Sequence, residues 1–260
     1  MSLTWDHFAA FPLLRWQGPA GIVAAFTGRQ GGVSTGPFAS LNLGLTTGDD
    51  RAAVAENRRR LCAAVGADPA RTAQNHQVHG KVVRVAEPLP GGYLAPAGDL
   101  PQADALITQE PDLALVALSA DCVSIVIAAL DGSAVAVVHA GWKGLVGGVV
   151  EATLAALGAG AYAAAVGPCA GPRAYEVGED VAGPLRERFG AGAAYGGTAD
   201  LAACAGVALL HAGVAPDQID IAGLCTISDA DAFFSYRRDG AMTGRQGVIA
   251  YRARPDAEES

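Results

Sequence analysis

The sequence predicts an α/β fold in which a β-sheet is covered on both of its faces. From residue 106 onward, segments of strand character alternate with segments of helical periodicity. The strand segments are almost continuously apolar, which is typical of strands buried on both sides. The 260 residues contain neither an internal repeat nor a convincing linker. We therefore expect a single domain over residues 1–260.

The composition is that of an ordinary globular protein, and it narrows the classes of partner. Hydrophobic residues make up 51% and charged residues 17%, which excludes wholesale disorder. The net charge of −8 argues against nucleic acid or an anionic membrane as the main partner. The five cysteines form no CxxC pair, and the N-terminus lacks the pattern of a secretory signal. These features favour a reduced, cytoplasmic protein.

The first half of the chain contains one clear helix signal between strands and loops. Apolar periodicity predicts a helix over residues 49–66, with Asp50 near its N-cap and Gly66 at its end. The run Arg58-Arg59-Arg60 should lie largely on the polar face of this helix. Around it we expect strands over residues 21–27 and 81–85, and loops over residues 28–34 and 87–101.

The second half of the chain is expected to supply most of the sheet. The apolar run over residues 113–130 is long enough to raise the question of a membrane span. Asp121 stands in its middle and the turn signal Asp131-Gly132 follows it, so two strands explain the run better. We expect strands over residues 113–119, 123–130, 133–139, 161–166, 219–224 and 247–251, and helices over residues 145–157, 181–189 and 201–212.

The turn signal also predicts the register of a hairpin. If Asp131 and Gly132 are the two central residues of a tight turn, His139 lies opposite Ser124. Cys122 lies two residues before Ser124 and points to the same face of the sheet. Cys122 and His139 are then diagonal neighbours, about 7–8 Å apart between backbones. Their side chains can meet each other or share a metal ion.

Two further histidines are candidates for a third donor. His76 and His79 are three residues apart, a spacing that places them on opposite faces of a strand, so at most one joins the pair. We favour His79, which lies next to Gly80 and the following strand. The set His79, Cys122 and His139 offers two neutral nitrogens and one thiolate. With Zn²⁺ it would carry a net charge of +1 and leave a fourth position open, the pattern of a catalytic zinc.

Seven ordered motifs carry a resemblance that spans nearly the whole chain, from Phe26 to Tyr251. They are Ser40-Leu41-Asn42-Leu43-Gly44, Gln77-Val78-His79-Gly80, Ala120-Asp121-Cys122, His139-Ala140-Gly141-Trp142-Lys143-Gly144, Gly167-Pro168-Cys169, Tyr175-Glu176-Val177-Gly178, and Phe233-Phe234-Ser235-Tyr236-Arg237-Arg238-Asp239-Gly240 with Thr243-Gly244-Arg245-Gln246. Together they resemble the laccase-domain, or multicopper polyphenol oxidase, family, also described as zinc-dependent purine nucleoside phosphorylases.

The resemblance implies a fold, a metal site and an activity. The implied fold is α/β (α+β), with mixed sheets sandwiched between helices. The implied metal ligands are His79, Cys122 and His139, the set reached from the hairpin register. The implied activity is phosphate-dependent cleavage of adenosine, inosine, guanosine and 5′-methylthioadenosine, with hydrolytic deamination of adenosine. The sequence departs from the pattern at Lys143, where arginine is common, and at Ser124, where proline is usual.

A phosphorylase needs an anion site and groups that transfer protons. The cationic candidates for contacts with phosphate are Arg29, Arg58, Lys143, Arg237, Arg238 and Arg245. Arg237 and Arg245 are preferred, because they lie in a polar and aromatic loop after a buried strand. Asn42 is a further candidate for contact with substrate. Asp121 and Glu176 are candidates for proton transfer.

Three other classes of function remain open. A copper-dependent polyphenol oxidase could use the two histidines and the cysteine with Cu²⁺, but the five histidines of the chain cannot also hold a trinuclear cluster. A metal-free hydrolase or deamidase could use Cys122 as nucleophile and His139 as base, which leaves His79 unexplained. A non-enzymatic binding module is the least economical interpretation.

Overall fold

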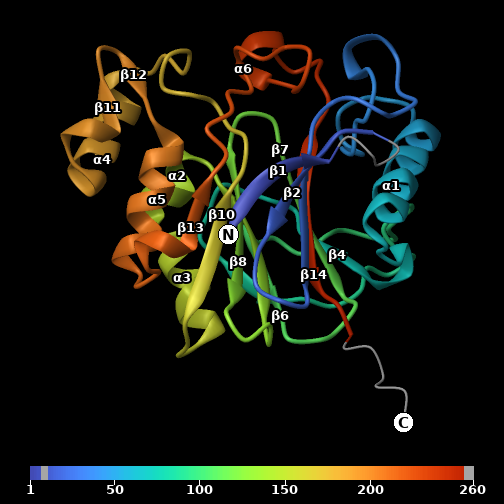
Figure 1. Cartoon of the computed structure of the whole chain (residues 1–260). Helices are drawn as coiled ribbons and strands as arrows, with labels where there is room; N and C mark the ends of the chain where they lie inside the picture. Colours follow the sequence, from blue (N-terminus) through green and yellow to red (C-terminus); the bar gives the residue numbers. More distant parts are fainter. Residues whose placement is uncertain (7–10, 255–260) are drawn as a thin grey trace.

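The computed structural model describes residues 1–6 and 11–254. In this part of the chain two large mixed sheets stack face to face, and helices cover the outer face of each sheet (Figure 1). The order of layers is therefore helix, sheet, sheet, helix. This arrangement confirms the predicted fold of mixed sheets between helices.

The first sheet has the strand order β1-β2-β3-β14-β7-β4, and only β4 runs parallel to its neighbour. Its strands are β1 (Ser2–Asp6), β2 (Leu13–Gln17), β3 (Ile22–Thr27), β14 (Gln246–Arg252), β7 (Ala114–Ser119) and β4 (Thr72–Gln74). The sequence pattern did not predict β1, β2 or β4. The predicted strands over residues 21–27, 113–119 and 247–251 are confirmed.

The second sheet has the order β13-β10-β8-β9-β6-β5, with parallel pairs at its two edges. Its strands are β13 (Ile219–Ile221), β10 (Tyr162–Val166), β8 (Val123–Ala129), β9 (Val135–Ala140), β6 (Ala105–Thr108) and β5 (Val83–Val85). A small hairpin pairs β11 (Ala194–Tyr195) with β12 (Thr198–Ala199).

Most helices lie against the second sheet. The α-helices are α1 (Arg51–Val65), α2 (Trp142–Gly147), α3 (Val149–Leu157), α4 (Glu179–Phe189), α5 (Leu201–His211) and α6 (Tyr236–Asp239). Short 3₁₀ turns occur at Gly36–Phe38, Pro69–Arg71, Ala191–Ala193 and Pro216–Gln218. Apolar residues of α2–α5 bury the outer face of the second sheet, and α1 covers the first (Figure 1). No helix in the described ranges is both long enough and apolar enough to cross a membrane.

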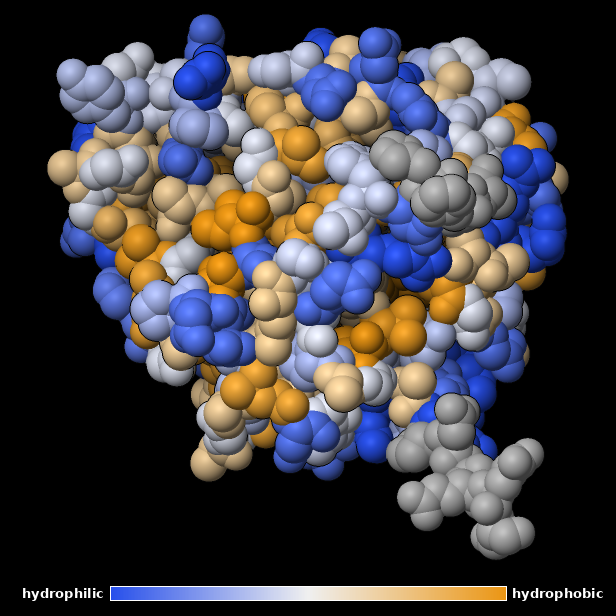
Figure 2. Space-filling view, in the orientation of Figure 1, coloured by the Kyte–Doolittle hydropathy of each residue, from blue (hydrophilic) through white to orange (hydrophobic). Residues whose placement is uncertain are grey.

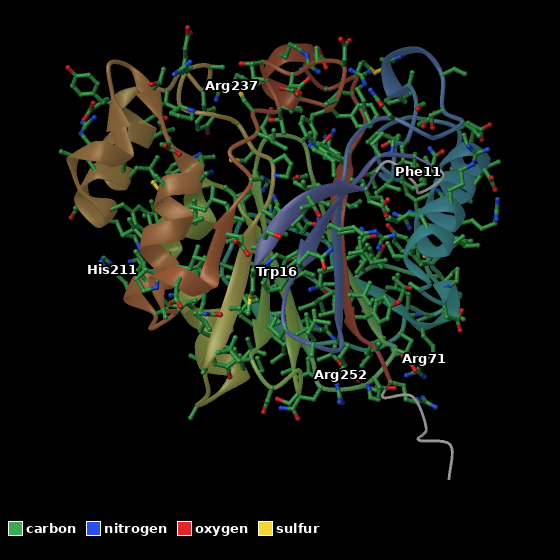
Figure 3. The ribbon with its side chains drawn as sticks, viewed as in Figure 1. Phe11, Trp16, Arg71, His211, Arg237 and Arg252 are labelled. Carbon is green, nitrogen blue, oxygen red and sulfur yellow. The ribbon has the colours of Figure 1, made fainter. Side chains whose placement is uncertain are left out.

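The central core lies between the two sheets. Phe26 and Val248 of the first sheet belong to the same buried cluster as Val126 and Val137 of the second. At the edge, the Trp16 indole donates a hydrogen bond of 2.8 Å to Asp220 Oδ2 and so ties β2 to β13 (Figure 3). On the face shown in Figure 2, apolar side chains form small groups between polar ones. The shared core and the bond at the edge therefore join the two sheets.

Two predictions about helices need correction. Helix α1 has the predicted ends, with Asp50 accepting a hydrogen bond from Ala52 N and Gly66 in the left-handed conformation. Arg58, however, does not lie on a polar face, because it is only 1% exposed. The predicted helix over residues 145–157 is two helices, α2 and α3, divided at Gly148, whose φ of +86° breaks the helix.

Candidate metal centre

The hairpin register places Cys122 and His139 together, as the turn signal predicts. β8 and β9 pair with Ser124 opposite His139, and Gly132 N donates to Ala129 O in the turn between them. Cys122 directly precedes β8, after Asp121, whose φ of +97° lies in the left-handed region. The predicted register is thus confirmed, and both side chains reach the same end of the second sheet.

His79 joins this pair from a separate loop. Each of the three residues His79, Cys122 and His139 offers one possible ligand atom, and these three atoms lie within 4.8 Å of one another. The rings of His79 and His139 meet edge to face, with their centroids 4.9 Å apart. His139 is buried, Cys122 is half-buried and His79 is exposed. Two donors are therefore fixed by the sheet, and the third borders an open space.

His76 does not join the cluster, although the reason differs from the predicted one. The segment that contains both histidines is not a strand, because β4 ends at Gln74. His76 pairs with Gln102 in an isolated bridge and is exposed, while His79 has a φ of +60° that turns its ring towards Cys122. The structure therefore places His79, and not His76, beside Cys122 and His139, but the alternation argument behind this prediction was wrong.

Asp104, which the sequence analysis missed, holds both histidines in place. Its buried carboxylate accepts hydrogen bonds from the backbone N–H groups of His79 (2.9 Å) and Gly80 (2.7 Å) and contacts His139 Nδ1 at 2.9 Å. It also accepts a weaker bond from Val78 N at 3.3 Å. Because Nδ1 is engaged, the Nε2 atom of His139 is left to face Cys122. A carboxylate that orients a ligand histidine in this way is a usual support of a metal site.

The electrostatics of the cluster favour an ionised thiol. Burial alone would raise the pKa of Cys122, but the neighbouring His139 and His79 rings lower it to about 6. Burial alone would lower the pKa of His139, but Cys122 and Asp104 raise it to about 9. Hydrogen bonds from His139 and from the Gly80 and Val78 backbone keep the pKa of Asp104 below its ordinary value despite its burial. A thiolate is the form of cysteine that binds metals.

The residues around the cluster fit a metal ion. Two imidazoles and one thiolate form a donor set typical of zinc, and their spacing is compatible with three ligands of one ion. A Cβ atom on Gly141 would come within 2.9 Å of His79 Cδ2 and 3.0 Å of Cys122 Sγ. Only glycine therefore leaves the space beside the donor atoms free.

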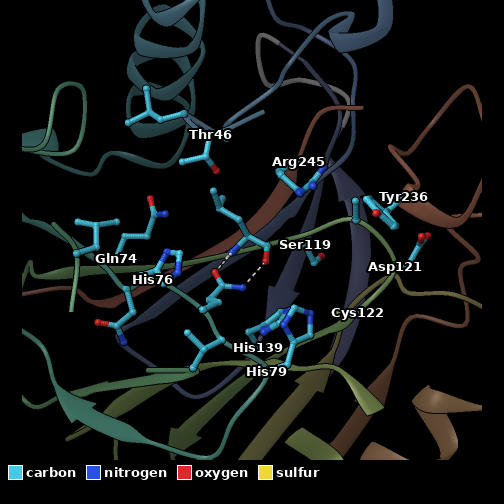
Figure 4. A pocket seen from close by; sticks show the side chains of 18 of the residues that line it. Thr46, Gln74, His76, His79, Ser119, Asp121, Cys122, His139, Tyr236 and Arg245 are labelled. Carbon is cyan, nitrogen blue, oxygen red and sulfur yellow. Dashed lines mark hydrogen bonds between the residues drawn. The ribbon is translucent and has the colours of Figure 1, made fainter. Parts of the chain in front are cut away.

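The cluster opens into a cavity of about 610 Å³ between the two sheets' ends. Figure 4 shows the His79 and His139 rings on one side of it, with Thr46 and Arg245 on the other. Four of the predicted cationic residues line the cavity, namely Arg58, Lys143, Arg237 and Arg245. Three aromatic residues, Trp142, Tyr175 and Tyr236, also line it. The cavity thus combines metal donors, cations and aromatic surfaces.

The four cations differ in how they are held. Arg245 is half-buried, and its Nη1 donates to the carbonyls of Thr243 (3.0 Å) and Gly244 (2.9 Å). Arg237 is an exposed residue of α6 (Figure 3), stacks on Tyr175 at 4.7 Å and donates to the carbonyl of Glu176.

Lys143 is exposed, with its Nζ 5.6 Å from the centroid of the Trp142 ring. Arg58 differs from these three because it is buried in the wall of the cavity.

Four other predicted residues, Arg29, Arg238, Glu176 and Asn42, lie outside the lining of the cavity. Arg29 donates to the carbonyls of Ala39 and Ala230, both at 2.9 Å, and stacks on Phe234. Arg238 donates to Thr226 O at 2.8 Å and pairs with Asp239.

The exposed Glu176 side chain does not line the cavity either. Arg29 and Arg238 therefore fasten loops to one another.

Asn42 and Asp121 fasten the loops that carry the cationic residues. Asn42 Oδ1 accepts from the backbone N–H groups of Gly44 (3.0 Å) and Arg245 (2.9 Å) from its buried position outside the lining. Asp121 lines the cavity, but each of its oxygens accepts a bond of 2.6 Å, from the Thr226 hydroxyl and from Arg237 N. Asn42 thus positions the backbone of Gly44 and Arg245, and Asp121 positions the Thr226 side chain and the backbone of Arg237.

The fold and the site together define a class of proteins in which two stacked sheets present a His–Cys–His candidate metal centre to a cationic cavity. The chain belongs to the family described as multi-copper polyphenol oxidoreductase laccase, whose sequence pattern matches residues 23–253. This membership confirms the resemblance found in the motifs.

Named relatives and solved structures cover almost the whole chain. A "purine nucleoside phosphorylase" of Xylella fastidiosa is 43% identical over 249 residues, which are 91% of this chain and 94% of that protein. A protein of the same name from Deinococcus radiodurans is 40% identical and covers 92% of each chain. The crystal structure of YlmD from Geobacillus stearothermophilus has a TM-score of 0.88 at 32% identity and covers 97% of this chain and 99% of that one.

Proposed function

We propose that this chain is a purine nucleoside phosphorylase that cleaves adenosine, inosine, guanosine and 5′-methylthioadenosine with phosphate. The observation that carries the proposal is the cavity, which brings three metal donors and four cationic side chains to one space. Relatives that bear this name and share 40–43% identity over most of their length support it.

His79, Cys122 and His139 are the residues proposed to hold Zn²⁺, with Cu²⁺ as the alternative ion. When bound, such an ion supplies Lewis acidity and can lower the pKa of a water molecule at its open position. A blue-copper site could use the same donors, but a trinuclear copper cluster would need a further group of donors. Residues 1–6 and 11–254 contain no second such group, and His211 lies away from the site on α5 (Figure 3).

The residues of the chain would bind and orient the two substrates. Phosphorolysis joins a phosphate oxygen to C1′ of the ribose while the bond from C1′ to the purine nitrogen breaks and the purine leaves with the electron pair. The cations of the cavity would hold the phosphate dianion and offset its charge. The rings of Trp142, Tyr175 and Tyr236 offer apolar faces on which a purine can stack.

Asp121 is proposed to position residues and not to transfer protons. Both of its oxygens already accept hydrogen bonds, which fix the loop that carries Arg237. A proton-transfer role for Glu176 has no support from the cavity, since this residue does not line it.

The decisive experiment incubates metal-analysed protein with adenosine, with and without phosphate, and identifies the products by mass. The proposal expects adenine and ribose 1-phosphate, formed only when phosphate is present. Adenine with free ribose in both samples would mean hydrolysis and would remove the anion site from the mechanism. Inosine would reveal the deaminase activity that the resemblance implies.

A metal-free Cys–His hydrolase is the second candidate, and one observation favours it. Cys122, His139 and Asp104 follow one another in contact, the order of nucleophile, base and orienting carboxylate in thiol hydrolases. The two candidates differ in their need for metal. Full nucleoside cleavage after removal of the metal by a chelator would favour the hydrolase, whereas recovery only on adding Zn²⁺ would favour the phosphorylase.

Two wider expectations remain predictions. A single domain predicts one cooperative unfolding transition for the whole chain. Cytoplasmic localisation predicts recovery of the protein in the cytosolic fraction of its cell.

A further inference from the structure

We propose that Arg58 and Gln74 form the part of the cavity that binds the phosphate co-substrate. The inference rests on the proposed function because that function makes phosphate a substrate. The buried charge and the free hydrogen-bond donors from which it is argued do not depend on that function. It assigns the anion to the buried wall of the cavity and not to the exposed cations Arg237 and Lys143.

Arg58 is a buried cation without an anionic partner. Its side chain is 1% exposed and is held by three neutral acceptors, Leu43 O (2.9 Å), Tyr93 O (2.7 Å) and Gln74 Oε1 (3.1 Å). None of the ion pairs found in the described residues includes Arg58. Burial lowers its pKa. The guanidinium also lies over the Tyr93 ring, 4.3 Å from its centroid, but no anion offsets its charge. A bound anion would therefore stabilise it.

Hydrogen-bond donors remain free at this point of the wall. A guanidinium has five N–H groups, and three of those of Arg58 are used in the bonds above. Because a guanidinium only donates, the oxygen of the Gln74 amide must face Arg58, which leaves the Gln74 NH₂ group directed elsewhere. Neither Gln74 Nε2 nor the Thr46 hydroxyl has a hydrogen-bond partner in the described ranges, and both residues line the cavity (Figure 4).

A second cation is fastened to the same stretch of backbone. The carbonyl of Leu43 accepts the bond from Arg58 Nε, and its N–H donates to the carbonyl of Arg245 at 3.0 Å. Arg58 and Arg245 therefore flank one loop, which continues into the cavity wall at Gly44–Thr46. We call Arg58, Gln74, Thr46 and Arg245 the cationic wall. Two positive charges with neutral donors between them match a phosphate dianion.

The test measures binding of inorganic phosphate to the metal-loaded protein by calorimetry, without nucleoside, in matched variants. Gln74→Glu keeps the acceptor for Arg58 but replaces the free amide by a second carboxylate oxygen, which neutralises Arg58 and repels phosphate. We expect phosphate affinity to fall about tenfold or more, with a melting temperature at or above that of the parent protein. Arg58→Lys should weaken phosphate similarly, because it loses the fork of donors.

Arg59→Met is the matched control, since Arg59 is the exposed neighbour of Arg58 and pairs only with Glu56. It should bind phosphate as the parent protein does. In the assay, Gln74→Glu should raise the KM for phosphate about tenfold while the KM for inosine changes less than about twofold. A merely structural role for Gln74 would not produce this difference between the two substrates.

The outcomes separate this inference from the proposed function. Parent-like phosphate binding in folded Gln74→Glu and Arg58→Lys would overturn the inference, while phosphate-dependent cleavage would leave the phosphorylase proposal standing. Weaker phosphate binding in both variants, together with cleavage that ignores phosphate, would support the anion site and contradict the phosphorylase. A parent protein that binds no phosphate at about 10 mM would also overturn the inference.

Discussion

The two sides of the cavity are built in different ways. Of the candidate metal donors, His139 stands in β9 and Cys122 directly before β8, so the register of the hairpin positions them, while His79 stands on a loop that Asp104 holds. The cationic wall stands on α1, on the end of β4 and on loops from distant parts of the chain, which meet through backbone carbonyls and the Asn42 side chain. A single substitution among the candidate metal donors should therefore abolish metal binding, whereas each substitution in the cationic wall should only weaken phosphate binding.

The largest effect is expected from Cys122→Ala. Changes to residues that merely support a metal ligand cost roughly 10–100-fold in affinity, so loss of the thiolate itself should cost more than about a hundredfold. Metal analysis of the purified protein and a nucleoside-cleavage assay measure the result. Cys204→Ala, which removes a buried thiol of α5, is the control. Unchanged metal content and activity in Cys122→Ala would remove the centre from the mechanism.

Asp104→Asn should be the next most damaging change on the donor side. An amide cannot accept the bonds of His79, Gly80 and His139 with two equivalent oxygens, so zinc affinity should fall about 10–100-fold. Competition with a chelator of known affinity measures this directly. Asp131→Asn in the exposed turn is the control. Parent-like zinc affinity in Asp104→Asn would show that the strands alone hold the donors.

Gly141→Ala tests whether the space beside the donors is needed. Its Cβ would lie 3.0 Å from Cys122 Sγ, so we expect about a tenfold loss of zinc affinity. Gly147→Ala is the control. Gly147 is the last residue of α2, and a Cβ there would meet nothing within 4 Å, so this variant should bind zinc as the parent protein does. Equal affinities in the two variants would mean that the centre tolerates a filled space.

The smallest effect is expected from His76→Ala. His76 is exposed and lies outside the donor group, so metal content should not change and activity should fall less than about threefold. His79→Ala, assayed beside it, should lose metal. A complete loss of metal in His76→Ala would show that the wrong histidine of the pair was chosen.

The sequence predicted the donor side better than the cationic wall because the former depends on local chemistry. Asp131-Gly132 specifies a tight turn, and the turn sets the partner of every residue in the hairpin. Asp104 could not be found in this way, since its role depends on the distant pairing of β6 with β9. A lone carboxylate between Ala103 and Ala105, at the start of an apolar strand, is the signal that could have marked it.

Arg58 shows why the cationic wall was predicted less well. Its charge led to the prediction of a polar face, although Arg58 lies four residues after Val54 and three before Leu61, on the buried stripe of the helix. In the folded chain Tyr93 and Leu43 cover that side of α1 and bury Arg58 against their carbonyls. The helical spacing could have marked Arg58 as buried, but no local signal in the sequence points to the distant carbonyls of Leu43 and Tyr93 that accept its hydrogen bonds.

The exposure of His79 has a consequence for how the centre is loaded. His139 is anchored in β9 and Cys122 lies directly before β8, but the exposed side chain of His79 can swing outward about its own bonds while Asp104 keeps its backbone in place. Ions can then be taken up and released through a single hinged ligand, without parting the sheets. Exchange of the ion would in that case be quick compared with unfolding, and the cell's supply of free metal would decide which ion the protein carries.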